Sequence, residues 1–197
     1  MCLGGPIFDL AKLKWLNGRY LREELSEDDV VERLIHWKLN ATRFRKILPH
    51  ALQRLENFSD FIPLTEFLFN EHPEITLENL IGKLDPAEAA KLLKLCEWEL
   101  EKIKNWQRDE LFILLQDIAK TEEKKLKEIL PLFFQVMSGK SISLPLFDAM
   151  SILGPDLVRV RLRKALDLLN SEGVGLSKKG LKVLEKEYRQ KYGNRID

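Results

Sequence analysis

Apolar side chains recur at intervals of three and four residues along nearly the whole sequence. This spacing gives a helix one continuous apolar face, whereas a half-buried strand needs strict alternation of apolar and polar residues. Alternating runs bounded by Asn-Gly or Asp-Gly turns are missing, apart from the single pair Asn17-Gly18. No repeat of fixed period and no low-complexity segment is present. The sequence therefore predicts an all-α protein with a compact array of helices.

Residues that cap helices predict where the first helices begin and end. Asp9 is expected to cap a short helix that ends or kinks at Gly18. Ser26 followed by Asp29 resembles a capping box, so a second helix should begin there. The expected buried face of this second helix consists of Val30, Val31, Leu34 and Ile35.

A third helical pattern crosses a proline. Its apolar series is Phe44, Ile47, Leu48, Ala51, Leu52, Leu55 and Phe58. Pro49 removes one backbone donor, so a bend or a break is expected there. Ser59 should cap a short helix that runs toward Phe69, and the turn-forming residues 70–73 mark a candidate subdomain boundary.

The second half of the sequence predicts longer helices. Asp85, Pro86 and Glu88 have the order of an N-cap, a first-turn proline and a first-turn acid, and the helix behind them should extend to Ile103. Further helices are expected over 106–118, from Thr121 to a stop at Gly139, over 144–153, over 155–169 and after Ser177.

The sequence contains few patterns of catalytic or metal-binding residues. Three scattered histidines, His36, His50 and His72, do not form a metal-binding pattern, and Cys2 and Cys96 belong to no CxxC pair. No glycine-rich phosphate loop is present, so catalysis and a metal site are not expected. The sequence contains no run of about 20 apolar residues and no basic-then-apolar leader, which predicts a cytoplasmic chain without a membrane partner.

Basic residues outnumber acidic ones in about the last forty positions, although the formal net charge of the chain is only +1. The residues concerned are Arg159, Arg161, Arg163, Lys164, Lys178, Lys179, Lys182, Lys186, Arg189 and Lys191. Such a surface attracts phosphates, but a lysine-rich terminal helix is also an ordinary solvated surface. Charge alone leaves both interpretations open.

Two segments resemble one known family. The run from Ile7 to Arg22, IFDLAKLKWLNGRYLR, is similar to the segment that closes the stem-contact domain of bacterial glutamyl-tRNA synthetases. The run MSGKSISLPLFD from Met137, followed by Ile152-Leu153-Gly154, resembles a late block of the same family. A weaker match leads from Gln53-Arg54 to Phe67-Leu68-Phe69 and resembles the first helical anticodon-binding subdomain.

The resemblance implies a cage of two packed helical subdomains around a tRNA anticodon. Residues 1–25 would be the end of the stem-contact domain, 26–80 the first anticodon-binding subdomain and 81–197 the second. No HIGH or KMSKS motif occurs, and Ser177 as a helix cap explains the sequence LSKK better than the second motif does. ATP and Mg²⁺ would therefore bind an absent catalytic half, and this chain would hold no cofactor. The match begins directly behind Met1-Cys2-Leu3, which favours an excised part of a longer protein. A monomer is expected.

The resemblance also implies site residues. Arg54 matches the arginine that contacts the third anticodon base, where glutamate and glutamine tRNAs differ. The block that lines the pocket for the other bases corresponds to Ser143, Leu144, Leu146 and Phe147. For Leu146 and Phe147, anchoring of a helix in the core is the competing interpretation, and it is favoured for one of the two. Phe134 stands where relatives commonly carry an arginine, so handling of the first anticodon base is expected to differ.

The expected contacts with the tRNA stem backbone come from Lys12, Lys14, Arg19 and Arg22, while Trp15 is expected in the core. The expected partner is tRNA(Glu), with tRNA(Gln) left open as a second, and no DNA. A helical protein-interaction module on a synthetase-derived scaffold is the alternative function.

Overall fold

The computed structural model describes residues 9–37, 41–141 and 143–193. All regular structure within these ranges is helical, which confirms the predicted all-α class. Contacts divide the chain into two compact units, Met1–Lys46 and Ile47–Asp197. The subdomain boundary predicted between residues 80 and 81 lies within the second unit and stays a prediction.

The first unit begins with α1 (Leu10–Glu23), which Asp9 caps as predicted. The Asp9 carboxylate accepts hydrogen bonds from the backbone N–H groups of Ala11 and Lys12 at 2.9 and 3.1 Å. The prediction that Gly18 ends the helix is wrong, because α1 continues to Glu23. A lone helical glycine costs only about 1 kcal/mol relative to alanine, which the rest of a helix can outweigh.

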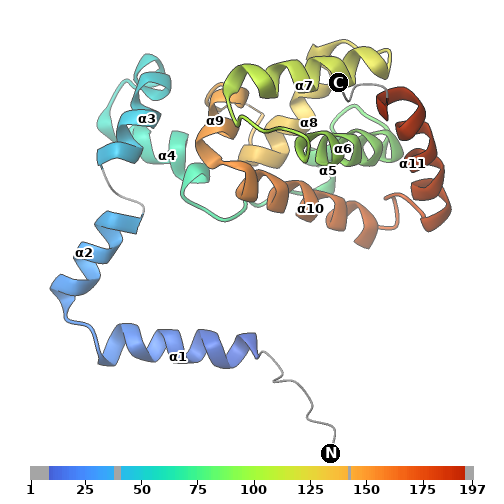
Figure 1. Cartoon of the computed structure of the whole chain (residues 1–197). Coiled ribbons are helices and arrows are strands. Elements are labelled where there is room, and N and C mark those ends of the chain that lie inside the picture. The colour runs from blue at the N-terminus through green and yellow to red at the C-terminus, as the bar shows by residue number, and fades with distance from the viewer. Residues whose placement is uncertain (1–8, 38–40, 142, 194–197) are drawn as a thin grey trace, which may run out of the picture. The chain divides into compact units, whose positions relative to one another are not determined.

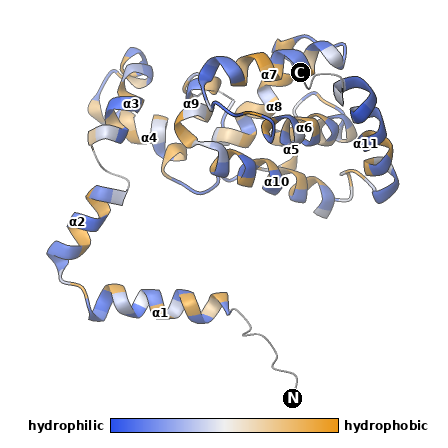
Figure 2. Cartoon of the chain, viewed as in Figure 1, coloured by the Kyte–Doolittle hydropathy of each residue, from blue (hydrophilic) through white to orange (hydrophobic). Residues whose placement is uncertain are grey.

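Helix α2 (Glu27–Trp37) begins at the predicted capping box. Ser26 N–H donates to the Asp29 carboxylate at 3.1 Å, and Asp29 N–H donates to Ser26 Oγ at 3.2 Å. The expected buried face is wrong within the described residues, since Val31 is 54% exposed and no α2 residue is buried. Trp15 on α1 is also 57% exposed rather than in a core, with the Arg19 guanidinium over its ring. Figure 2 shows apolar and polar residues mixed along both helices.

The second unit contains the end of α3 and the remaining helices (Figure 1). Its elements after α3 (Ala41–Ala51) are η1 (Leu52–Arg54), η2 (Phe58–Asp60), α4 (Phe61–Thr65), η3 (Glu66–Leu68), α5 (Leu77–Ile81), α6 (Pro86–Leu100), α7 (Arg108–Thr121), α8 (Leu126–Ser138), α9 (Leu146–Leu153), α10 (Pro155–Ser171) and α11 (Lys178–Tyr192). Helix α10 packs on α5, α6, α8 and α9, and α7 packs on α6, α8 and α9. Leucine and phenylalanine side chains from these helices fill the core between them.

The helix that crosses Pro49 is shorter than predicted. It ends at Ala51 and gives way to the 3-10 turn η1, after which Leu55 is extended. Leu52 and Phe58, predicted on its buried face, are 61% and 97% exposed. The next turn is capped by Asn57 rather than by the predicted Ser59.

The later helix ends follow their local signals closely. Asp85 caps α6 through bonds to the N–H groups of Ala87 and Glu88, although α6 ends at Leu100 and not at Ile103. Thr121 was expected to begin a helix, but it is the last residue of α7, and α8 begins at Leu126. The predicted stop at Gly139 is confirmed.

The C-terminal helix α11 begins as predicted behind Ser177, whose Oγ accepts the Gly180 N–H at 3.0 Å. Its tyrosines attach it to α6 and to the end of α7. The Tyr188 ring lies 4.7 Å from Trp98, and its hydroxyl donates to Glu99 at 2.7 Å. Tyr192 is fully buried, with its hydroxyl 3.3 Å from Glu122.

Candidate nucleic-acid interface

Arg54 and Ser143 lie in contact, although 89 residues separate them in the sequence. Arg54 is the last residue of η1, and its Nη1 donates a hydrogen bond to the Ser143 carbonyl oxygen. Leu55, directly behind it, packs against the core while Arg54 itself is exposed. The end of η1 therefore presents one residue to solvent and anchors the next against the core. The structure thus brings together the two segments that the sequence nominated separately.

The second segment is the loop between α8 and α9. Gly139 ends α8 in the left-handed conformation, with φ +67°, and a Cβ on it would lie 2.9 Å from the Glu74 carbonyl oxygen. Ser143 is buried, and no hydrogen-bond partner for its Oγ occurs in the described part of the chain. The close approach to Glu74 means that this loop is packed directly against the chain that follows η3.

The other predicted residues of this block divide into two groups. Leu144 and Leu146 are buried, with 1% and 4% exposure, so their side chains belong to the core. Phe147 is half-buried, and its ring meets that of Phe112 edge-on at 5.3 Å and 83°. Phe134 on α8 is likewise half-buried and packs against the core. Phe147 and Phe134 keep part of their surface accessible.

Lys140 fastens the segment after Arg54 to the α8–α9 loop. Its Nζ donates to the Pro63 carbonyl at 2.6 Å and to the Glu66 carboxylate at 2.7 Å. On α9, Asp148 lies 3.8 Å from His50 of α3 and 3.6 Å from Arg108 of α7. These contacts hold the two sides of the Arg54–Ser143 contact in one arrangement.

Arg161 makes the most buried polar contact of this region. Its guanidinium donates to the carbonyl oxygens of Glu71 at 3.1 Å, of Phe67 and Asn70 at 2.6 Å each, and of Met137. Burial lowers its pKa to about 10, so the side chain stays charged near neutral pH. Arg161 therefore joins the end of η3 to the end of α8, on both sides of the candidate interface.

The basic residues of α10 do not form the free positive surface that their number suggested. Arg159 donates to the Leu100 carbonyl at 3.1 Å, Arg163 to Glu97 at 2.9 Å, and Lys164 lies 2.6 Å from His72. The α11 lysines are exposed, and so is Arg163 despite its ion pair, whereas Arg161 is buried.

The four cations predicted on α1 do not share one face. An α-helix turns by about 100° per residue, so Lys12 and Arg19 lie close together around the helix axis. Arg22 lies about 60° from Arg19. Lys14 lies about 160° from Lys12, near the opposite side. Arg19 also forms an ion pair with Glu23. One continuous backbone could contact Lys12, Arg19 and Arg22 together, but not Lys14 at the same time.

Phe58 is an exposed residue whose exposure the helical pattern did not predict. It was placed on a buried helix face, but it begins η2 and is 97% exposed. The sequence Asn57-Phe58-Ser59-Asp60 has the spacing of a capping box, and that signal would have placed Phe58 in a turn.

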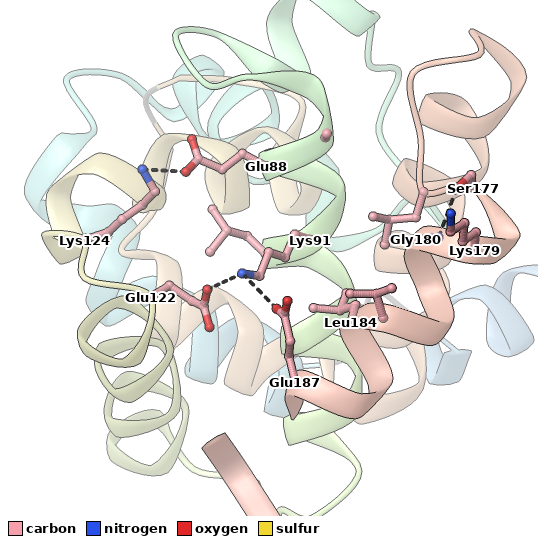
Figure 3. Close-up of a pocket in the computed structure, with 13 residues that line it drawn as sticks. Glu88, Lys91, Glu122, Lys124, Ser177, Lys179, Gly180, Leu184 and Glu187 are labelled. Atoms are coloured by element: carbon pink, nitrogen blue, oxygen red, sulfur yellow. Dashed lines mark hydrogen bonds and ion pairs between the residues drawn. The ribbon is translucent and has the colours of Figure 1, made fainter. Parts of the chain in front are cut away.

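A pocket of about 570 Å³ lies between α6 and α11, away from these residues in sequence (Figure 3). Lys91 in this pocket pairs with Glu122 at 2.6 Å and with Glu187 at 3.7 Å, and Lys124 pairs with Glu88 at 2.6 Å. Both lysines are neutralised by carboxylates, so the pocket offers phosphate little net positive charge.

The described residues show neither a metal site nor a membrane-spanning helix. They contain no group of three or more histidine, cysteine or acidic side chains able to hold a metal ion. No helix among them is long and apolar enough to cross a membrane.

An exposed arginine and half-buried phenylalanines on an all-helical unit are the kinds of side chain that bind bases in nucleic-acid-binding domains. The family model for the anticodon binding domain matches residues 29–166, so the chain belongs to that family.

Its sequence is similar to glutamate–tRNA ligases. The enzyme of Saccharophagus degradans is 41% identical over 187 residues, which are 94% of this chain and 36% of that protein. That of Pseudomonas paraeruginosa is 40% identical over 185 residues, 93% of this chain and 36% of that protein. That of Marinobacter nauticus is 37% identical over 187 residues, which are 94% of this chain and 37% of that protein. The chain thus spans little more than a third of the length of these relatives.

Proposed function

We propose that this chain binds tRNA(Glu) and recognises its anticodon as part of a glutamate–tRNA ligase. The parent would attach glutamate to tRNA with ATP and Mg²⁺, which bind outside these residues. Cytoplasmic location and a monomeric state belong to the same proposal. Acceptance of tRNA(Gln) as well depends on how the third anticodon base is recognised.

The observation that carries the proposal is the contact between Arg54 and Ser143. The family resemblance assigns these two residues to different anticodon bases, from segments 89 residues apart. Adjacent bases of one loop need adjacent protein groups, and the contact between Arg54 and Ser143 meets this requirement.

Arg54 would recognise a base edge. Its hydrogen bond to the Ser143 carbonyl uses one N–H group and holds the guanidinium plane in place. The other N–H groups can then donate to acceptors such as cytosine O2 and N3 or guanine O6 and N7. Unpaired bases in an RNA loop can be turned outward and recognised in this way.

Phe147 and Phe134 would contact base faces, while Leu144 and Leu146 would shape the pocket from the core side. Aromatic rings that keep an accessible face can stack with a base. Phe134 offers a ring where relatives commonly have an arginine, so it would exchange a hydrogen-bonding or ionic contact for stacking.

On α1, we propose that Lys12, Arg19 and Arg22 contact the phosphate backbone of the tRNA stem, with Lys14 making a separate contact. Such contacts position the duplex without recognising its sequence. Replacing Lys12 with alanine should weaken binding equally for all anticodons and reduce the slope of log affinity against log salt by about 0.7 to 0.9. An unchanged slope in binding titrations at several salt concentrations would remove Lys12 from this role.

The test of the proposal is a titration of this chain with tRNA(Glu) and tRNA(Gln) at two salt concentrations. Arg54→Ala should weaken binding of tRNA(Glu) by about 1 to 3 kcal/mol and reduce discrimination at the third anticodon base. Arg189→Ala is the matched control, because it removes the same charge from an exposed α11 side chain paired only with Glu185 among the described residues.

A protein-interaction module on the same scaffold predicts a different result. It would bind neither tRNA with a salt-dependent affinity, and Arg54→Ala and Arg189→Ala would then be equivalent. The exposed apolar faces of α1 and α2 are the feature that favours this second candidate.

A further inference from the structure

Exposed apolar side chains in the second unit are concentrated near Arg54 in the sequence. Among the described residues of that unit, the large hydrophobic side chains with high exposure are Leu52, Phe58, Ile62, Ile113 and Val183. Three of these five fall between residues 52 and 62, around Arg54. Phe58 is the extreme case, with 97% exposure.

The exposure of Phe58 does not come from a loosely packed segment. Leu55, Phe61 and Leu64 from the same stretch pack against the core. The Asp60 carboxylate accepts hydrogen bonds from the N–H groups of Glu56 and Asn57 at 3.0 and 2.8 Å, and Asp60 N–H donates to the Asn57 carbonyl at 3.1 Å. These hydrogen bonds hold the backbone of the turn in one conformation, with the Phe58 side chain in solvent.

The charges near Phe58 in the sequence are mixed, with Glu56 and Asp60 negative and Arg54 positive. Asp60 is engaged by backbone N–H groups, and Glu66 is paired with Lys140. Glu56 is the acid of this stretch for which no partner is seen. Arg54 supplies a permanent positive charge four residues before Phe58.

We infer that Phe58 is a further nucleotide-binding residue, which stacks on an unpaired base of the anticodon loop next to the base that Arg54 recognises. This inference rests on the proposed function. An aromatic ring can stack on any base, and such a contact contributes to affinity without selecting a sequence. The backbone of the turn is already fixed by the Asp60 hydrogen bonds, so binding would order only the two side-chain torsions of Phe58, at a small cost in conformational entropy.

The inference is tested by binding of this chain to anticodon stem-loops of tRNA(Glu). One loop is unmodified, and each of the others carries a single abasic nucleotide at one loop position. The proteins are the unaltered chain, Phe58→Ala, Phe58→Trp, Phe58→Leu and the control Ile113→Ala, which shortens another exposed apolar side chain. Thermal unfolding of each variant confirms that the fold is intact.

Phe58→Ala should bind the unmodified loop about 5- to 150-fold more weakly, since one base–aromatic stack contributes about 1 to 3 kcal/mol. Phe58→Trp should retain the affinity, Phe58→Leu should lose most of it, and Ile113→Ala should match the unaltered chain. At one abasic position, Phe58→Ala should have no further effect, which identifies the stacked base by a thermodynamic cycle.

Other outcomes overturn the inference in distinguishable ways. If the unaltered chain binds the loops but Phe58→Ala binds them equally well, Phe58 contacts no base, and tRNA binding still stands. Equal affinity of the leucine and tryptophan variants, with no abasic position suppressing the alanine effect, would show that Phe58 does not act by stacking on a base. If the unaltered chain binds no loop, the proposed function fails together with the inference.

Discussion

Arg54 and Arg161 both donate to backbone carbonyls, but their surroundings give them different roles. Arg54 is exposed and makes one such bond, so most of its donors remain available to a ligand. Arg161 is 1% exposed and donates hydrogen bonds to four backbone carbonyl oxygens. Four of its five N–H donors are used and the group is buried, so Arg161 is not accessible to a ligand and its contribution is to stability.

We predict that Arg161→Leu lowers the free energy of unfolding by about 3 kcal/mol or more. The substitution leaves several buried carbonyls without a donor, and each such loss costs about 1 to 3 kcal/mol. Arg163→Leu on the same helix is the control, with an effect of about 1 kcal/mol or less, because that side chain is 57% exposed and pairs with a single carboxylate. Urea unfolding measures both. Equal effects would contradict the structural role of Arg161.

A second residue-scale prediction concerns acid stability. Burial alone would raise the pKa of Glu97, but hydrogen bonds from Lys94 and Arg163 outweigh it and lower the pKa below its ordinary 4.5. Because the folded-state pKa is depressed, this stabilisation is complete above the unfolded-state pKa and is lost as pH falls through the folded-state value.

Glu97→Gln should therefore lower stability by about 2 kcal/mol at pH 7 and make the loss of stability below pH 5 less steep than in the unaltered chain. Chemical unfolding measured from pH 7 to pH 3 provides the comparison. Exposed Asp156→Asn on α10 is the control, and parallel curves for Glu97→Gln and the unaltered chain would refute the prediction.

At the scale of single residues, the sequence nominated Arg54 but could not separate exposed from buried side chains. Arg161 and Arg163 are two positions apart on one helix and look equivalent as sequence. Their difference comes from Phe67, Asn70 and Glu71, about 90 residues away, which only folding brings to Arg161.

At the scale of elements, the loop between α8 and α9 depends on one glycine. Gly139 and Gly173 both have positive φ, +67° and +73°, but only Gly139 faces a backbone oxygen, at 2.9 Å from a Cβ built on it. We predict that Gly139→Ala destabilises the fold by more than about 2 kcal/mol and weakens tRNA binding by displacing the loop that carries Ser143. Gly173→Ala should cost about 1 kcal/mol, the conformational term alone. Thermal unfolding and tRNA titration measure the two effects; similar stability of the two variants would show that the contact with Glu74 is unimportant.

Helix ends were predictable where the signal is local. Asp85, Ser177 and Gly139 satisfy backbone groups within a few residues of themselves, so spacing in the sequence is enough. The segment from Pro49 to Phe69 was predicted poorly, because its short turns follow contacts with α8, α9 and α10 rather than helical periodicity.

At the scale of the whole molecule, the buried core begins at Ile47 and lies in the second unit. Helices α1 and α2 contribute no buried residue. We predict that removal of residues 1–40 changes the midpoint of thermal unfolding by less than about 4 °C, corresponding to about 1 kcal/mol or less. Calorimetry of the shortened and full chains tests this. A larger fall would show that the first unit stabilises the second.

The sequence by itself determined the all-α class, most helix starts in the second half and the resemblance that nominated Arg54 and Ser143, because periodicity, caps and motifs are properties of neighbouring residues. The tertiary structure decided which basic side chains bond to other groups of the chain and that Leu144 and Leu146 lie in the core. It also decided that Arg54 contacts Ser143 and that Phe58 is exposed. Those outcomes depend on contacts between residues tens of positions apart, and the free energy of such contacts is set by the packing of the whole unit rather than by any local pattern.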